Sequence, residues 1–317
     1  MLTSFFGNSR PVNFLLLASF ILIGYLVSVL FGSELQIEVQ SISAHLVLSA
    51  ICVFSMLLLN FIVTKNKLTK LNTLTVLFYS SFMVMLPAVF MEDNIIAANF
   101  FLLLAFRRIV SLRKDTNSSK KILDASVWIT VASLFYFWSL LFFVPLWIAI
   151  LQKPNTNFKQ VLIPFIGFLA VIIINIALQL LVDNSIDWIF EWKDPVSLDF
   201  SVYNTVKTLL PATVIIGLLI WAGIWKLFML PTLPFNERSS HLLTLYIGVI
   251  SLLIALATPD KTGAELLFVL APLSIITTNY FEKKSKKHDA LEYWFKEILL
   301  WLVVVFACVF LFVVVFG

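Results

Sequence analysis

The sequence is poor in charge, cysteine and glycine, and each shortage excludes a class of protein. Only 13% of the 317 residues are charged, 61% are hydrophobic and the mean hydropathy is +1.00. A water-soluble globule of this length could not bury that much apolar surface. Cys52 and Cys308 both lie in hydrophobic stretches, which argues against a disulfide framework or a thiolate metal site. The nine glycines form no phosphate-binding loop. The composition is that of a polytopic membrane protein.

The sequence also lacks the patterns of the common hydrolases. His45, His241 and His288 are isolated, and there is no His-Glu-x-x-His helix of the kind that binds zinc. No base can be assigned to a nucleophilic serine. The sequence therefore identifies no cofactor and no metal, and whether the protein is an enzyme stays open.

Long apolar runs dominate the chain instead. A hydrocarbon core of ~30 Å needs roughly 20 apolar residues in a helix. We predict spans at residues 12–32, 45–63, 73–90, 95–110, 161–182, 208–230, 241–257, 265–281 and 298–316. Residues 123–152 have basic clusters at both flanks, so we expect two short helices that form a membrane hairpin with its turn at 134–138. The predicted fold is an all-α polytopic bundle, with about nine full spans plus the hairpin, about eleven helices in all, in one integral membrane domain over residues 1–317.

The loops separate by charge when these segments are threaded alternately across a bilayer. All but three of the 22 Lys and Arg residues fall on one side, the exceptions being Lys193, Lys207 and Lys261. The other side collects eleven of the 18 acidic residues. Because Lys and Arg in short loops mark the cytoplasmic face, we predict a cytoplasmic N-terminus and a bacterial inner-membrane location. The same topology accounts for the pI near 9.0 without nucleic acid as a partner.

Three segments exceed simple connections. Residues 107–121 form a basic cytoplasmic loop, residues 183–207 an external loop of alternating acids and aromatics, and residues 283–297 a short cytoplasmic interfacial helix. Basic residues beside the inner leaflet attract anionic lipid head groups. The candidates for that contact are Arg107, Arg108, Lys283, Lys284, Lys286 and Lys287.

The external acids are the candidate catalytic residues. Glu34 and Glu38 are four residues apart and would share one face of a helix, and Glu92 and Asp93 stand on the next external turn. Such carboxylates could act as a general base, or hold a divalent metal against a phosphate leaving group. The alternative is solvated loop charge placed there by topology. Within the spans, the polar residues Asn175, Gln179, Ser133 and Ser139 would line the path of a transporter or form interhelical hydrogen bonds.

Several stretches carry a resemblance to known families. They are Arg10-Pro11-Val12-Asn13, Asn99 through Arg107-Arg108, Asp124 through Ala132-Ser133-Leu134-Phe135-Tyr136, and Glu265-Leu266-Leu267-Phe268 with Pro272 and Thr278-Asn279-Tyr280. Together they resemble, over the whole chain, an uncharacterised family of polytopic inner-membrane proteins from Bacteroidota, a domain of unknown function.

The layout is also similar to that of class C glycosyltransferases, which take sugar from a polyprenyl-phosphate donor. That resemblance implies Glu34 or Glu38 as the catalytic carboxylate, and Glu92 or Asp93 as the acid of the second external loop. The short first external loop and the use of Glu where Asp is typical depart from that family's pattern.

Three classes of function follow. The first is a non-catalytic or lipid-handling component of cell-envelope biogenesis or of a membrane complex. The second is a class C glycosyltransferase-like enzyme, and the third is a small-molecule or lipid transporter. The expected partners are the lipid bilayer and either a polyprenyl-phosphate lipid or other membrane protein subunits.

Overall fold

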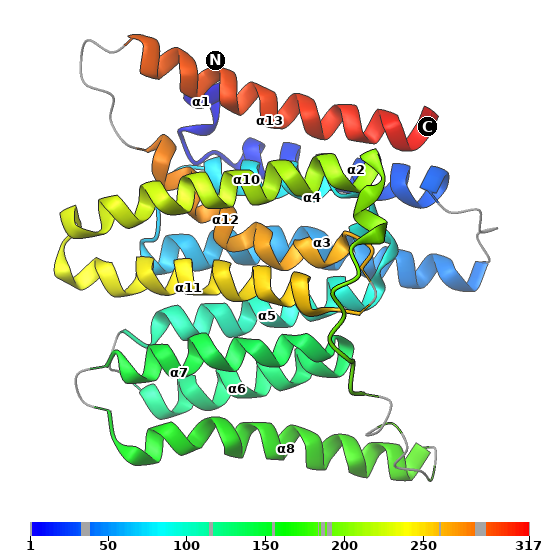
Figure 1. Ribbon diagram of the computed structural model, residues 1–317, viewed down its shortest axis with the longest axis vertical. Coiled ribbons are helices and arrows are strands. Elements are labelled where there is room, and N and C mark those ends of the chain that lie inside the picture. Colours follow the sequence, from blue (N-terminus) through cyan, green and yellow to red (C-terminus); the bar gives the residue numbers. More distant parts are fainter. Residues whose placement is uncertain are drawn as a thin grey trace.

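The computed structural model describes residues 2–32, 39–113, 117–153, 156–182, 184, 188, 192–259, 261–282 and 290–316. All regular elements in these ranges are helical (Figure 1). The first half contains α1 (Leu2–Phe6), α2 (Pro11–Gly32), α3 (Val39–Asn66), α4 (Leu74–Val84), η1 (Pro87–Met91), α5 (Asp93–Ser111), α6 (Ser118–Phe135), η2 (Phe137–Phe142) and α7 (Phe143–Leu151). The second half contains α8 (Phe158–Val182), η3 (Ser201–Asn204), α10 (Val206–Met229), η4 (Leu230–Thr232), α11 (Phe235–Ala257), η5 (Ala264–Leu266), α12 (Leu267–Phe281) and α13 (Ala290–Phe316).

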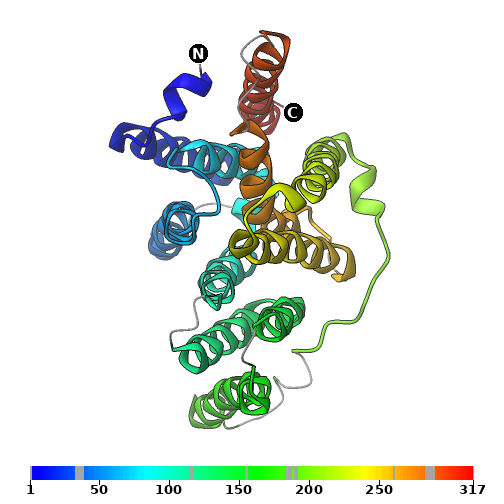
Figure 2. The same ribbon diagram turned by 90° about the vertical axis from the view of Figure 1, so that its left-hand side faces the viewer.

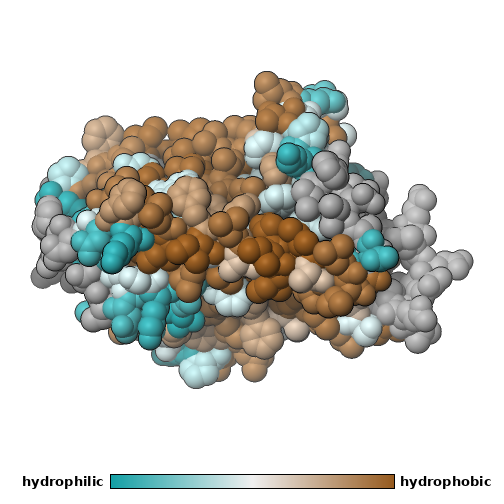
Figure 3. Space-filling model, turned by 90° about the horizontal axis from the view of Figure 1, so that it is seen from below, coloured by the Kyte–Doolittle hydropathy of each residue, from teal (hydrophilic) through white to brown (hydrophobic). Residues whose placement is uncertain are grey.

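Eight helices in the described ranges are long and apolar enough to cross a membrane. Residues Leu74–Val84 and Phe137–Leu151 form shorter apolar helices. The face seen in Figure 3, which includes α8, is hydrophobic along its middle, with hydrophilic residues gathered mainly toward the left end. The prediction of an all-α polytopic bundle is confirmed, and the chain is a multi-pass membrane protein. Its orientation in the membrane stays a prediction.

The predicted span at residues 73–90 consists of two pieces. Helix α4 ends at Val84, and the 3-10 helix η1 begins at Pro87. A proline lacks the backbone N–H and disfavours helical geometry in the residue before it. Leu86 accordingly has φ −113° and ψ 78°, outside the helical region.

The predicted interfacial helix at residues 283–297 falls only partly within the described residues. Residues 283–289 lie outside them, and residues 290–297 form the first turns of α13, which continues to Phe316. No proline or glycine occurs between Ala290 and Phe316, so nothing in the local sequence ends the helix before the final apolar run.

The chain reverses direction at Tyr136. Helix α6 ends at Phe135, and Tyr136 is extended with φ −149° and ψ 104° before η2 and α7 lead back. Next to this pair, α8 packs closely on α6 through Gly167, where a Cβ atom would lie only 1.9 Å from the Ser126 Oγ. Small residues at a helix interface permit such close approach of backbones.

Helix α12 lies near the middle of the bundle and α8 at its edge (Figure 2). In their apolar windows, 89% of the α12 residues and 11% of the α8 residues are buried inside the protein.

The long helices run between two ends. One end, on the right in Figure 1, holds the start of α5, the turn after α6, the segment at 192–205 and the C-terminal end of α11. The other holds the segment at 67–73, the join between α10 and α11 and the C-terminal end of α12.

Candidate functional site

A cavity of about 330 Å³ lies at the end of the bundle where the hairpin turns. We call it the hairpin pocket. Four segments that are distant in the sequence meet there: the start of α5, the hairpin turn, the segment after α8 and the loop after α11. Its lining residues are Glu92, Asn94, Ile95, Ser133, Leu134, Phe135, Tyr136, Phe137, Trp192, Asp194, Thr258, Pro259 and Thr262.

Trp192 attaches the segment after α8 to the hairpin. Helix α6 ends two residues after Ser133, so the Ser133 carbonyl is among those that a helix leaves without an internal partner. The Trp192 indole Nε1 donates a hydrogen bond of 2.6 Å to that oxygen. The indole ring also contacts the Phe137 ring edge to face, at 5.3 Å between centroids. One side chain thus satisfies an end-of-helix carbonyl and forms an aromatic wall of the pocket.

Tyr136 places a phenol in the pocket wall. Its ring packs on Phe268 of α12 with 5.2 Å between centroids. Its hydroxyl is buried and forms no hydrogen bond of ordinary geometry with the described residues. Burial raises the pKa of Tyr136, the neighbouring Thr258 hydroxyl offsets part of that rise, and the negative charges of Glu265, Asp194 and Glu92 add smaller increases. The phenol therefore stays protonated and is a neutral hydrogen-bond donor beside carboxylates.

A buried carboxylate supports the pocket from behind. Glu265 is fully buried in η5, where it accepts 2.5 Å and 3.2 Å hydrogen bonds from the Tyr203 hydroxyl and the Thr262 backbone N–H. Gly263, which lies between Thr262 and the start of η5, has φ 88°, in the left-handed region that favours glycine, and permits the tight turn into η5. Burial and the charge of Glu265 raise the pKa of Tyr203, so it remains a donor at neutral pH.

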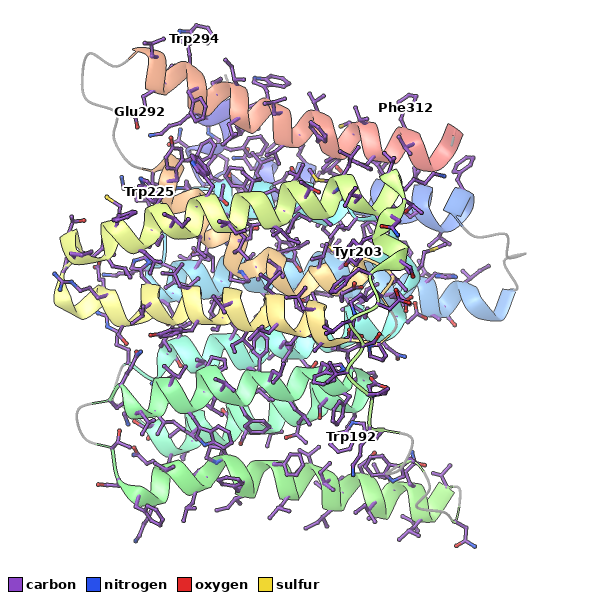
Figure 4. The ribbon with its side chains drawn as sticks, viewed as in Figure 1. Trp192, Tyr203, Trp225, Glu292, Trp294 and Phe312 are labelled. Carbon is purple, nitrogen blue, oxygen red and sulfur yellow. The ribbon has the colours of Figure 1, made fainter. Side chains whose placement is uncertain are left out.

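Lys261 completes this support. The side chain is 4% exposed, and its ammonium donates hydrogen bonds of 2.7 Å and 2.8 Å to the carbonyl oxygens of Ser197 and Thr258. It also lies over the Phe200 ring, 4.6 Å from the centroid. Lys261 and Glu265 together fasten the segment at 192–205 to the loop after α11. Figure 4 shows Trp192 and Tyr203 at this end of the molecule, opposite to Trp225.

The structure places the four predicted carboxylates differently. Glu92 precedes α5 and lines the hairpin pocket half-buried. Asp93, the first residue of α5, is exposed and is not part of the lining. Glu34 and Glu38 lie outside the described residues. Of the predicted catalytic set, only Glu92 is thus placed in a cavity.

Of the candidate lipid-contacting residues, Arg107 and Arg108 lie on α5 toward its C-terminal end, away from the hairpin pocket. The Arg107 guanidinium lies 4.6 Å from the centroid of the Phe61 ring, and Arg108 forms a 2.8 Å ion pair with Asp124. Lys283, Lys284, Lys286 and Lys287 lie outside the described residues. Contact of this group with lipid head groups stays a prediction.

The polar residues proposed for a transport path lie in two places. Asn175 and Gln179 are half-buried on α8, the least buried of the long helices. Ser133 is buried and its hydroxyl donates to the Thr130 carbonyl, while Ser139 is buried with an unpartnered hydroxyl. Of these four residues, Ser133 lines the hairpin pocket and the other three do not, so they share no common cavity there.

The hairpin pocket combines carboxylates, hydroxyls and aromatic faces. Carboxylates accept hydrogen bonds from hydroxyl or ammonium groups, and aromatic faces pack against cations or apolar ring faces. In the described part of the chain, no group of three or more His, Cys, Asp and Glu side chains has the spacing of a metal site. The lining thus suits a polar, non-anionic group.

Sequence reasoning singled out three of the segments at this site, including the turn that carries Glu92, but it did not predict that they meet. It singled out the hairpin turn and the acidic, aromatic loop at 183–207, yet assigned no role to Tyr136, Trp192 or Asp194. The alternation of acids and aromatics around Trp192 was the available signal. That alternation indicates a segment at the membrane interface, and it does not show which turn the segment would cover.

Comparison with known proteins adds one match. A family model, described as a family of unknown function (DUF6427), matches residues 13–316. No curated protein and no solved structure matches the chain. Since the family model covers nearly its whole length, the chain belongs to the DUF6427 family.

Proposed function

We propose that this protein is a lipid-handling, multi-pass component of a bacterial inner membrane, active in cell-envelope biogenesis in Bacteroidota. In this proposal the hairpin pocket holds the polar head of an amphipathic molecule whose apolar part stays among the helices or in the bilayer. The hairpin end faces away from the cytoplasm, in line with the positive-inside rule.

The observation that carries the proposal is the position of a polar, aromatic cavity at the end of an otherwise apolar bundle. Its lining includes Tyr136, Trp192 and Glu92. The cavity borders Phe135, which is 42% exposed on the outer surface of the hairpin. An amphiphile could therefore contact apolar surface and polar lining at the same time.

The lining also limits the chemistry of the head group. Glu92 and Asp194 bring negative charge to the pocket, and Glu265 adds more from behind. Like charges repel strongly where water is partly excluded. A head group of net negative charge is therefore disfavoured, and the hydroxyls of a glycosyl head or the ammonium of a zwitterionic amine head are favoured.

Binding to the full-length protein in phosphatidylcholine nanodiscs tests this proposal. Native mass spectrometry would compare retention of a glycosyl diacylglycerol, phosphatidylethanolamine and phosphatidylglycerol. We expect one of the first two to be retained over phosphatidylglycerol, and Trp192→Ala and Glu92→Gln each to weaken binding about tenfold. Asp93→Asn is the matched control, because Asp93 adjoins Glu92 but does not line the pocket. Equal retention of all three lipids, or equal binding by all variants, would reject the proposal.

The position of Glu92 supports a second candidate, a glycosyltransferase-like enzyme with a polyprenyl-phosphate sugar donor. Glu92 would act as the carboxylate that accepts a proton from the acceptor hydroxyl. This version predicts that Glu92→Gln abolishes a glycan-dependent phenotype at unchanged protein level. Loss of lipid retention with an intact glycan phenotype would leave only the lipid-handling proposal.

A further inference from the structure

A second polar cavity, of about 340 Å³, lies at the end of the bundle opposite the hairpin pocket. We call it the lysine pocket. It lies where α10, α11 and α12 meet the segment after α3, and its charged and polar lining includes Lys67, Lys70, Lys226, His241, Asn279 and Glu282. Neither the hairpin pocket nor the proposed function uses any of these groups.

Lys226 is a buried cation with a neutral partner. The residue is 3% exposed, and its Nζ donates a 2.8 Å hydrogen bond to the Asn279 Oδ1. No carboxylate among the described residues forms an ion pair with it. An ammonium has three protons to donate, and a buried charge is costly unless it is paired. Lys226 therefore retains donor capacity and unbalanced positive charge at the cavity wall.

His241 supplies a second unused group. It is 5% exposed on α11, lines the same cavity, and its Nδ1 has no hydrogen-bond partner. Buried polar atoms in native proteins are nearly always hydrogen-bonded, and an exception calls for an explanation such as a bound ligand. An imidazole nitrogen can donate to an anion once it carries a proton.

The acids of the pocket offset this charge only in part. Glu282 accepts hydrogen bonds of 2.7 Å from the Lys70 backbone N–H and 2.5 Å from the Asn72 Nδ2, so its carboxylate is already engaged. The remaining acid of the lining is Glu237, at the start of α11. Three lysines face two glutamates in the lining, and the deepest charged group is Lys226.

We propose that the lysine pocket binds a phosphate group, which accepts hydrogen bonds from the Lys226 Nζ and the His241 Nδ1. Phosphate oxygens are strong acceptors for such donors. Trp225, Met229 and Leu233 give the same cavity an apolar wall. The phosphate comes either from the head group of a phospholipid or from a soluble phosphate ester. The site is independent of the hairpin pocket.

The experiment uses the full-length protein in phosphatidylcholine nanodiscs, with three probes: dihexanoyl phosphatidic acid, glycerol 3-phosphate and inorganic phosphate. Thermal unfolding and native mass spectrometry would measure binding. We expect Lys226→Met to abolish stabilisation by the probe and His241→Asn to weaken binding about tenfold. Lys207→Met, which removes a lysine near the hairpin end, should leave binding unchanged.

The probes distinguish the two sources of phosphate. Binding of the short-chain lipid alone assigns a phospholipid head group, and binding of glycerol 3-phosphate or inorganic phosphate assigns a soluble ester. Because removal of a buried charge need not harm folding, Lys226→Met should unfold without probe at a temperature no lower than the unsubstituted protein. Absence of binding by every probe, or undiminished binding by both Lys226→Met and His241→Asn, would overturn the proposal.

Discussion

The two polar ends of the bundle bury opposite charges in opposite ways. At the hairpin end, the fully buried Glu265 accepts hydrogen bonds from Tyr203 and Thr262. At the other end, Lys226 is 3% exposed and donates to the amide oxygen of Asn279. Both groups are removed from water to a similar degree.

The difference in pairing indicates that the charge of Glu265 is structural and that the charge of Lys226 is available to a ligand. Tyr203 and Thr262, which donate to Glu265, come from the segments that it fastens together, so its charge serves to close the hairpin end. Lys226 keeps unused protons next to an unpartnered imidazole in the same cavity. A buried charge indicates function most strongly where the protein itself leaves it incompletely paired.

Removing the buried carboxylate tests the structural side of this comparison and should have the largest effect. Glu265→Ala leaves the Tyr203 hydroxyl and the Thr262 N–H without their acceptor and opens a cavity. We expect a loss of about 3 kcal/mol in the free energy of unfolding, measured by denaturant titration in micelles. Glu265→Gln, which keeps the shape and one acceptor, should lose less. Equal stability of Glu265→Ala and the unsubstituted protein would show that Glu265 is not a fastening group.

Removing the acceptor that Lys226 has among the described residues tests the other side. Asn279→Leu leaves the buried ammonium without a protein partner, and we expect a loss of about 2 kcal/mol. The double variant Asn279→Leu with Lys226→Met should recover most of that loss, because the uncompensated charge is then gone. Additive effects of the two substitutions, measured in the same titration, would contradict this account.

Weakening the attachment of the 192–205 segment should have a smaller effect. Trp192→Phe keeps an aromatic ring beside Phe137 but removes the donor to the Ser133 carbonyl. We expect a loss of about 1 kcal/mol and faster hydrogen exchange across residues 192–205. Trp301→Phe, at a half-exposed position on α13, is the control and should change neither quantity. Unchanged hydrogen exchange in Trp192→Phe would show that the Trp192 hydrogen bond does not hold residues 192–205 on the hairpin.

The smallest effect concerns pH and Glu282 beside the lysine pocket. Burial raises the pKa of Glu282 above its ordinary 4.5, against hydrogen bonds from Asn72 and Lys70 that lower it. Between 4.5 and the folded-state pKa, the folded protein binds more protons than the unfolded chain, so the contribution of Glu282 to stability falls as pH rises through that window. Glu282→Gln should therefore flatten the unfolding temperature between roughly pH 4 and 7. An unchanged pH profile would count against the raised pKa.

Much of the fold could be predicted because a bilayer constrains sequence strongly. Spans must be apolar and must satisfy their backbone hydrogen bonds internally, so their positions are visible as hydrophobic runs. The exceptions have local causes. Pro87 separates η1 from α4, and the absence of a helix breaker after Ala290 joins residues 290–297 to the last span.

The candidate sites were less accessible from the sequence. Glu92 was singled out for its place on an external turn, and the structure gives it a cavity. Tyr136, Trp192 and Asp194 carry no motif, and their relation depends on which loop covers the hairpin. Lys226 belongs to no motif either, and the structure buries it against Asn279. Contacts between residues so distant in the chain leave no periodicity or spacing to read.

The all-α class, the approximate spans and the separation of basic from acidic loops can be predicted from the sequence alone, because the solvent acts on each segment independently. The positions of α12 inside and α8 outside, and the meeting of Glu92 with Tyr136 and of Lys226 with His241, become visible only in the folded protein. Lipid is as apolar as the helices. Their arrangement therefore follows from the fit of side chains between neighbours and not from hydrophobicity along the chain.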